Sequence, residues 1–299
     1  MEENRKRHEI INAPYNPVTG LGAVGERKKI SIKDSPIGDM YLPVELIKEN
    51  LFIRRLAKYG FKGYIIRFIK EVEYSEEALN QLWIEFIKYR IIYDFEYWAY
   101  SFIFIKDKVS PKDIPFKLNR AQRRVLNKLE KLRKAGKPIK FILLKARQWG
   151  GSTLVQIYML WIMLVHRRNW NTVICGDVET QSRNVRAMIT KALNKYPSYL
   201  LGETVKFTPF EGSSKNKVIQ NTNCVVSIGS FQKPDTLRSG DISGAHLTEI
   251  GLWRATPGKK PEDLIQSISG SIYDTAYTIL GLESTAKGVG NFFHRTWQQ

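Results

Sequence analysis

Residues 141–153 read Phe-Ile-Leu-Leu-Lys-Ala-Arg-Gln-Trp-Gly-Gly-Ser-Thr, and a largely apolar stretch continues to Val165. This order predicts a strand, a glycine-containing loop and a long apolar helix. A loop of this kind presents backbone N–H groups and a helix N-terminus to a polyphosphate. The segment therefore predicts a phosphate-binding loop.

The loop departs from the usual G-x-x-x-x-G-K-S/T pattern. If Gly150 is the sixth position, Ser152 is the eighth and Gly151 occupies the place of the lysine. Lys145 then occupies the place of the first glycine, so a lysine enters from the other end of the loop. Taken alone, such a loop fits a strand-to-helix turn without a ligand as well as it fits a nucleotide site.

Side chains around this loop predict a nucleotide-phosphate site. The Ser152 hydroxyl at the helix start is placed to ligate Mg²⁺. Lys145 and Arg147 can both direct their charge to the phosphates. A register with Gly151 as the sixth position would make Thr153 the metal ligand, and both registers stay open.

The composition points to a polyanionic partner. The chain has 299 residues with 47 Lys and Arg against 29 Asp and Glu, a formal net charge of +18. Between Lys112 and Gly150, thirteen basic residues face only Asp113 and Glu130. Such an excess favours nucleic acid, although a basic solvated surface is the alternative.

The cysteines and the hydropathy of the chain indicate in which compartment the protein is expected. Cys175 and Cys224 lie in apolar stretches, which predicts buried thiols in a reducing compartment and no disulfide or metal framework. The first residues form no apolar signal segment, and the run from Ile157 to Val165 is too short to cross a bilayer. We expect a protein that is not secreted and has no membrane partner.

Three regions are expected along the chain. Residues 1–43 are rich in turn signals and predict an irregular N-terminal arm. Residues 44–112 predict a helical region, with a helix start at Ser75 and a connector near its end. Residues 113–299 alternate strand and helix patterns, which predicts an α/β domain with a mainly parallel sheet. The predicted strands are 140–144, 172–176, 224–228, 245–249 and 277–282, the predicted helices are 119–134, 152–166, 182–196 and 290–297, and residues 211–223 predict a loop or hairpin.

Two further strand ends carry polar groups. Ala245-His-Leu-Thr-Glu249 ends in a carboxylate of the kind that orients the attacking water in a nucleotide hydrolase. The preceding residue is usually an aspartate that holds the Mg²⁺ shell, and here it is Thr248. Gly281-Leu-Glu-Ser-Thr-Ala-Lys-Gly288 ends in hydroxyls that can sense a γ-phosphate. Each segment also fits an ordinary polar strand end or turn.

Four motifs in order resemble the ATPase portion of the large terminase subunit of tailed bacteriophages, the motor that pumps DNA into procapsids. Phe116-Lys-Leu-Asn-Arg-Ala-Gln122 is similar to the family's adenine-reading segment, and residues 145–153 are similar to its deviant phosphate loop. Leu237-Arg-Ser-Gly-Asp-Ile-Ser-Gly-Ala-His-Leu-Thr-Glu249 resembles its Arg-Gly segment and acidic strand. Glu283-Ser-Thr-Ala-Lys-Gly-Val-Gly-Asn-Phe-Phe293 resembles its coupling motif.

The resemblance implies a RecA-like P-loop NTPase fold of the additional-strand type, preceded by a helical lid region, and an enzyme that hydrolyses ATP with Mg²⁺. Gln122 would read adenine, and Lys145 would neutralise the β- and γ-phosphates. Arg147 would stabilise the transition state, Ser152 would bind Mg²⁺, and Glu249 would polarise the water. The nucleotide-binding loop implied in this way consists of Lys145, Ala146, Arg147, Gln148, Trp149, Gly150, Gly151, Ser152 and Thr153.

The resemblance also assigns coupling residues. Ser284, Thr285 and Arg238 would couple hydrolysis to movement. Thr248 in the aspartate position would lie in the second shell of the metal. Family members usually continue into a nuclease domain with clustered carboxylates, but after Trp253 the chain has only Glu262, Asp263, Asp274 and Glu283. We therefore expect no nuclease domain and no nuclease activity in this chain.

Partners and location follow from the same resemblance. The expected partners are double-stranded DNA, a portal protein ring, the small terminase subunit and further copies of the chain in a ring, with a pentamer as the expected form. The expected location is the host cell cytoplasm, with transient docking on the procapsid. Two alternatives stay open: a helicase-like nucleic-acid-dependent ATPase, and a non-catalytic DNA-binding or capsid-assembly protein with a decayed nucleotide site.

Overall fold

The computed structural model describes residues 14–69, 75–107, 109–234 and 241–299. The chain forms two compact units, and the division falls within helix α6 (Arg120–Lys134). The N-terminal unit comprises Met1–Asn127 and Pro197–Thr204, and the sheet unit comprises Lys128–Tyr196 and Val205–Gln299. The three regions expected from the sequence (1–43, 44–112 and 113–299) were defined by sequence pattern alone. These boundaries stay predictions.

The N-terminal unit begins with an antiparallel hairpin, which occupies part of the expected irregular arm, and continues as helices. The Ser75 hydroxyl accepts a hydrogen bond from the Ala78 N–H (3.1 Å), so the predicted helix start is confirmed. Helix α3 changes direction at Gly60, where φ is +71°. The elements are β1 (Arg27–Ser31), β2 (Asp39–Pro43), α2 (Val44–Glu49), α3 (Leu51–Phe68), α4 (Glu76–Tyr93), α5 (Phe95–Phe102), β3 (Phe104–Lys106), β4 (Asp113–Pro115) and η2 (Ser198–Leu200).

A buried ion-pair network holds the N-terminal unit together. Asp94 accepts hydrogen bonds from both terminal nitrogens of Arg27 (2.9 and 2.8 Å) and from Arg90 Nε (3.1 Å). Burial raises the pKa of Asp94, but the two guanidinium groups outweigh it and lower the pKa to about 2. Arg123, one of the thirteen basic residues, pairs with buried Glu96 (2.8 Å). This arginine therefore stabilises the core of its own unit and is not available to a polyanion.

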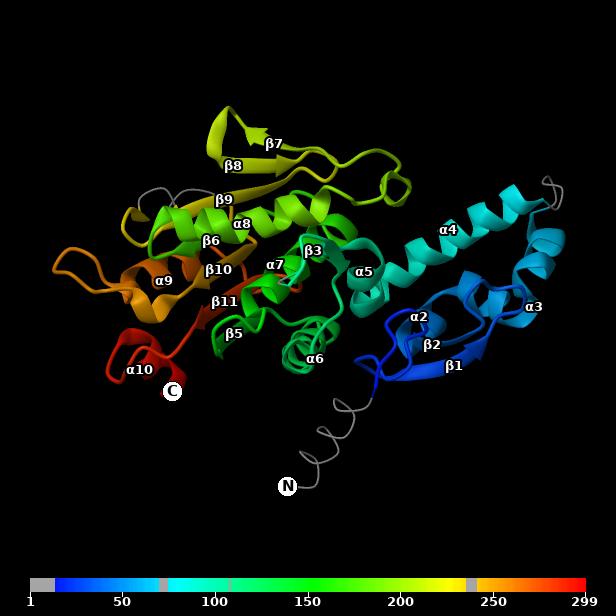
Figure 1. Ribbon diagram of the computed structural model, residues 1–299, viewed down its shortest axis with the longest axis horizontal. Coiled ribbons are helices and arrows are strands. Elements are labelled where there is room, and N and C mark those ends of the chain that lie inside the picture. The colour runs from blue at the N-terminus through cyan, green and yellow to red at the C-terminus, as the bar shows by residue number, and fades with distance from the viewer. Residues whose placement is uncertain (1–13, 70–74, 108, 235–240) are drawn as a thin grey trace, which may run out of the picture. The chain divides into compact units, whose positions relative to one another are not determined.

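The sheet unit contains one seven-stranded sheet in the order β5-β11-β10-β6-β9-β8-β7 (Figure 1). Neighbouring strands from β5 to β9 are parallel, and β8 and β7 are antiparallel. The strand order places β11 between β5 and β10, so the strand before the phosphate loop is separated from the acidic strand by one additional strand. The strands are β5 (Ile139–Leu144), β6 (Thr172–Gly176), β7 (Phe207–Phe210), β8 (Ser213–Ile219), β9 (Cys224–Ser230), β10 (Gly244–Thr248) and β11 (Ile279–Ser284).

The apolar runs of the sequence form the central strands. Parallel strands are covered on both faces, so successive residues must be apolar. Every residue of β6, β10 and β11 is buried. The five predicted strands are confirmed, with shifts at their ends. Glu249 and Tyr277 lie outside the strands at φ of +54° and +71°. Residues 211–223 form the β8 side of a hairpin, so the hairpin alternative is confirmed.

The sheet unit contains the helices predicted at 152–166, 182–196 and 290–297, with shifts at their ends, and two further helices at 250–252 and 261–270 that were not predicted. The helices are α7 (Gly151–Trp161), which continues as the π-helical turn η1 (Ile162–His166), α8 (Glu179–Leu193), the short η4 (Ile250–Leu252), α9 (Pro261–Gly270) and α10 (Phe292–Gln298). All residues of α7 from Leu154 to Trp161 are buried, which confirms a core helix. In the part of the chain that is described, we find no helix with the length and apolarity that a membrane crossing requires.

The end of α6 belongs to the core of the sheet unit. Arg133 pairs with Glu130 (2.8 Å), and the hydroxyl of Tyr158 in α7 donates to the same carboxylate (2.8 Å). Arg133 also donates to the Tyr277 hydroxyl (3.2 Å). A second arginine of the basic stretch is thus used in folding, whereas Lys131 and Lys134 of the same helix are exposed.

Candidate nucleotide site

Three neighbouring parallel strands bring their carboxyl ends to one edge of the sheet. Strand β5 leads into Lys145, β10 leads into Glu249, and β11 ends at Ser284. Helix α7 begins at Gly151, six residues after Lys145 along the chain. Ligands of open α/β sheets bind at this edge, where loops leave the strands. The phosphate loop, the end of the acidic strand and the start of the coupling motif therefore meet at one place in the sheet unit.

The loop between β5 and α7 has an unusual backbone. Gln148 has a φ of +61°, and Gly150, the N-cap of α7, has a φ of +86°. Residues other than glycine rarely adopt a positive φ of this size. A Cβ at Gly151 would lie 2.9 Å from Trp149 Cζ2 and 3.1 Å from Lys145 Cδ. The usual position of the lysine therefore has no room for a side chain, because the stem of Lys145 and the Trp149 ring fill that space.

Lys145 directs its charge into the site. Its side chain is 8% exposed, and its Nζ lies 3.0 Å from Glu249 Oε1 and 4.0 Å from Glu283 Oε1. Its backbone N–H donates to the Ser284 carbonyl (2.9 Å), which extends the β5–β11 pairing by one residue. The lysine is thus held by the sheet at one end and by carboxylates at the other.

Glu283 occupies the centre of the site and is fully buried. Its Oε1 accepts hydrogen bonds from the Ser152 hydroxyl (2.5 Å) and from the Thr248 hydroxyl (2.8 Å). His246 Nε2 lies 3.1 Å from the same oxygen, and the other ring nitrogen of His246 lies 2.6 Å from Gln156 Nε2. Burial raises the pKa of Glu283, but His246, Lys145 and the Ser152 hydrogen bond outweigh burial and lower the pKa to about 2.

Glu249 follows β10 and is the more accessible acid, with a side chain that is 26% exposed. Its Oε1 pairs with Lys145, and its Oε2 accepts a hydrogen bond from the Thr285 hydroxyl (3.2 Å). The Ser284 hydroxyl accepts from the Gly251 N–H (2.9 Å) and donates to the Thr285 carbonyl (2.9 Å). The hydroxyls after β11 are therefore connected to the acid and to the turn that follows it.

The structure does not bring every predicted residue into this cluster. Arg147 is exposed in the turn of the loop, and the Thr153 hydroxyl is directed to Met188 Sδ of α8 (3.7 Å). Gln122 belongs to the N-terminal unit, where its side-chain oxygen accepts from the Asn119 N–H (2.9 Å). Arg238 lies outside the described residues.

The sequence pattern did not predict Glu283, His246 or Gln156 as site residues. The one available signal was a carboxylate that closes the apolar run Ile279–Leu282 in a strand without other charges. His246 and Gln156 carry no such signal, because a single polar residue in an apolar strand or helix is ordinarily satisfied by a local partner.

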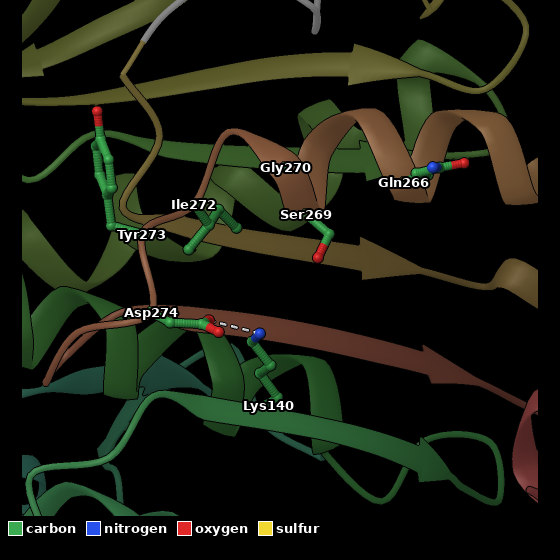
Figure 2. Close-up of a pocket in the computed structure, with 7 residues that line it drawn as sticks. All are labelled: Lys140, Gln266, Ser269, Gly270, Ile272, Tyr273 and Asp274. Carbon is green, nitrogen blue, oxygen red and sulfur yellow. Dashed lines mark ion pairs between the residues drawn. The ribbon is translucent and has the colours of Figure 1, made fainter.

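A surface pocket of the sheet unit lies away from this cluster. It is lined by residues of α9, of the turn after it and of β5, and Lys140 and Asp274 form an ion pair of 2.6 Å across it (Figure 2). Lys140 is the second residue of β5, so this pocket lies toward the amino end of the strand, opposite Lys145. Among the described residues, no group of three or more His, Cys, Asp or Glu side chains could hold a metal ion without other ligands.

The strand order and the glycine loop before α7 define an α/β fold of the P-loop, additional-strand type. No protein-family model and no curated protein sequence matches the chain. Among solved structures, the HK97 bacteriophage large terminase matches with 21% identity and a TM-score of 0.50, over 66% of this chain and 37% of its own. The chain resembles the matched part of that protein in fold, which confirms the expected fold class.

Two further similar structures come from other phages. The N-terminal domain of the DNA packaging ATPase from bacteriophage phi29 matches at 9% identity over 56% of this chain and 84% of that one, with a TM-score of 0.41. The large terminase of a thermophilic bacteriophage, solved in complex with ADP, matches at 13% identity over 55% of this chain and 37% of that one, with a TM-score of 0.37.

Proposed function

We propose that this chain is an ATP-hydrolysing motor that translocates double-stranded DNA into a viral procapsid, as the ATPase portion of a large terminase. The observation that carries the proposal is the meeting of Lys145, Ser152 and Glu249 at the carboxyl edge of β5, β11 and β10. A phosphate-neutralising cation, a hydroxyl at a helix start and an acid beside them are the groups that phosphoryl transfer to water requires.

Each residue has a role that its position supports. The N–H groups at the start of α7 receive phosphate oxygens, and Lys145 neutralises their charge. A polyphosphate competes with Glu249 for Lys145, because the carboxylate and the phosphate share one Nζ, which lies 3.0 Å from Glu249 Oε1. Glu249, once released, accepts the proton of the attacking water. Arg147 is exposed in the loop and reaches a γ-phosphate by rotating its side chain, as Arg fits this charge distribution.

Mg²⁺ bound together with the nucleotide would offset phosphate charge during transfer. The residues present fit such an ion, because Ser152 directs its hydroxyl to a buried carboxylate of the same site. Thr153 directs its hydroxyl away to α8, which favours the register with Ser152 as the metal ligand. Thr248 would act on the ion indirectly, through its hydrogen bond to the same carboxylate.

The coupling role of Ser284 and Thr285 is also part of the proposal. Thr285 donates to Glu249, and Ser284 is bonded to the turn that follows Glu249. A change in charge at Glu249 therefore acts directly on the segment after β11. Gln122 as the reader of adenine and Arg238 as a coupling residue rest on the resemblance alone.

DNA, the portal ring, the small terminase subunit, a homo-oligomeric ring such as a pentamer and a cytoplasmic location at the procapsid are proposed from the same resemblance. The net charge of +18 and the exposed lysines of α6 support a polyanionic partner.

The experiment is an ATPase assay on the full chain with Mg²⁺, with and without duplex DNA. We expect hydrolysis that duplex DNA stimulates, without strand separation of a forked duplex. Glu249→Gln should reduce turnover by about 10²- to 10⁴-fold while nucleotide binding is kept. Glu262→Gln, the same change at an exposed surface ion pair, is the matched control.

Three outcomes would contradict parts of the proposal. Unwinding of the fork would favour a helicase-like ATPase. Nucleotide binding without hydrolysis in any condition would favour a non-catalytic protein. Undiminished turnover in Glu249→Gln would remove this residue from the chemistry.

A further inference from the structure

The acidic strand β10 lacks the carboxylate that usually precedes the catalytic acid, since Thr248 stands there. In the strand register, Thr248 is paired directly with Glu283 of β11. Paired residues of neighbouring strands lie about 5 Å apart, and a glutamate is one methylene longer than an aspartate. A carboxylate from β11 therefore reaches the space that an aspartate at position 248 would occupy.

We propose that Glu283 supplies the metal-shell carboxylate that Thr248 cannot, so that the acid for the metal has moved from β10 to β11. This inference rests on the proposed ATPase function and adds a residue to it. In this proposal Glu283 acts on the metal, whereas Glu249 acts on the attacking water.

The hydrogen bonds of Glu283 support this role. The Ser152 hydroxyl, the candidate metal ligand of the loop, donates to Glu283 Oε1 (2.5 Å). The Thr248 hydroxyl donates to the same oxygen (2.8 Å). A carboxylate that is bonded to the loop hydroxyl lies where an ion held by that hydroxyl would be adjacent to it.

The second oxygen of Glu283 gives an independent observation. Oε2 is buried and accepts no hydrogen bond from any described residue. A buried carboxylate oxygen without a donor is costly, and its usual explanation is a water or an ion. Mg²⁺ keeps several water ligands and takes only one or two protein groups, so one serine and one carboxylate beside phosphates suffice.

The alternative carboxylate is Glu249, and its bonds assign it elsewhere. Both of its oxygens have partners, Lys145 and Thr285, and it lies at the more exposed side of the site. The identity of Thr248 then has a physical reason. An aspartate at 248 would place a second negative charge against Glu283, whereas threonine offers a donor.

The test measures metal affinity in the complex with ADP, which needs no turnover. Electron paramagnetic resonance counts free Mn²⁺ during titration of the full chain with ADP. Glu283→Gln should lower Mn²⁺ affinity by about 10- to 100-fold, while ADP binding in EDTA stays as in the wild type. Glu262→Gln should change neither quantity. Thr248→Asp/Glu283→Gln returns the acid to β10 and should recover most of the Mn²⁺ affinity.

An unchanged Mn²⁺ affinity in folded Glu283→Gln would overturn the proposal. If that variant does not fold, the unsubstituted chain still tests it. With ¹³C-carboxyl glutamate, electron–nuclear double resonance should detect a glutamate carbon coupled to Mn²⁺, and the coupling should persist in Glu249→Gln. Its absence would overturn the inference, whereas a wild-type chain that binds no nucleotide at all would overturn the proposed function.

Discussion

Adding one methyl group at Gly151 tests whether the stem of Lys145 fills the space that a side chain at position 151 would need. A Cβ at this position meets Trp149 Cζ2 at 2.9 Å and Lys145 Cδ at 3.1 Å, both closer than ordinary contacts. The ring and the lysine stem must therefore move in Gly151→Ala. Overpacking of this kind costs about 1–3 kcal/mol. The gain in helix propensity at the first turn offsets at most about 1 kcal/mol of it.

Gly270 provides the matched control. It is also a helical glycine, the last residue of α9, and a Cβ there meets nothing within 4 Å. Gly270→Ala should stabilise the chain by about 0.5–1 kcal/mol through backbone entropy alone. We therefore expect the unfolding free energies of the two variants, measured by urea denaturation, to differ by about 0.5–4 kcal/mol.

Gly151→Ala should also weaken ADP binding, because the displaced stem of Lys145 carries its Nζ away from its place near Glu249. Lys145→Ala/Gly151→Lys restores the usual lysine position in the sequence, but we expect it not to restore binding, because the Trp149 ring still lies 2.9 Å from a Cβ at 151. Full binding by this variant would show that the ring gives way easily. Equal stabilisation by Gly151→Ala and Gly270→Ala would refute the interpretation that the Trp149 ring and the stem of Lys145 fill the place of a side chain at 151.

Three further predictions concern single charges. Lys145→Met should lower ADP affinity by about 10- to 100-fold in equilibrium binding, since charge-assisted hydrogen bonds contribute about 1.5–3 kcal/mol; unchanged affinity would contradict it. Arg147→Ala should reduce kcat by about 10³- to 10⁵-fold with ADP affinity nearly kept, and Arg147→Lys should not rescue it. Asp94→Asn should lower the unfolding free energy by about 3–5 kcal/mol, because two buried guanidinium groups lose their partner. The folded pKa of Asp94, about 2, lies below its usual 3.8, so its contribution is present above pH 3.8 and is lost as the pH falls toward 2. Urea denaturation across the range from pH 5 to pH 3 should show a shallower loss in Asp94→Asn, and an equal loss would contradict the role of this residue.

Local patterns predicted much of the sheet unit. Strand β6 agrees with its prediction at both ends, and β5 differs by one residue. Buried parallel strands are continuous apolar runs, and such runs are visible in sequence. Lys145, Ser152 and Glu249 were predicted because each stands at a change from an apolar run to a loop or helix.

Strand order was not contained in any local pattern. The placement of β11 between β5 and β10 comes from packing over the whole sheet, and it alone puts Glu283 opposite Thr248. Side-chain pairing also determines which residues of the basic stretch are buried. Arg123 and Arg133 read as surface charges in the sequence, but both are buried and pair with the buried carboxylates of Glu96 and Glu130.

The displaced lysine and the displaced acid are connected by geometry. Lys145 extends from β5 and Glu283 lies on β11, which is the direct neighbour of β5, whereas position 248 lies one strand further away. An acid on β11 therefore lies on the strand next to the one that carries the lysine, and Nζ lies 4.0 Å from Glu283 Oε1. Without Lys145, the buried carboxylate of Glu283 would lose one of the groups that lower its pKa, which is costly in a protein interior. With both changes, the carboxylate keeps a cation, the loop hydroxyl keeps its acceptor, and Glu249 keeps an exposed face for water. If Glu283 supplies the acid, as proposed, the threonine at 248 is the expected consequence of an acid on the adjacent strand.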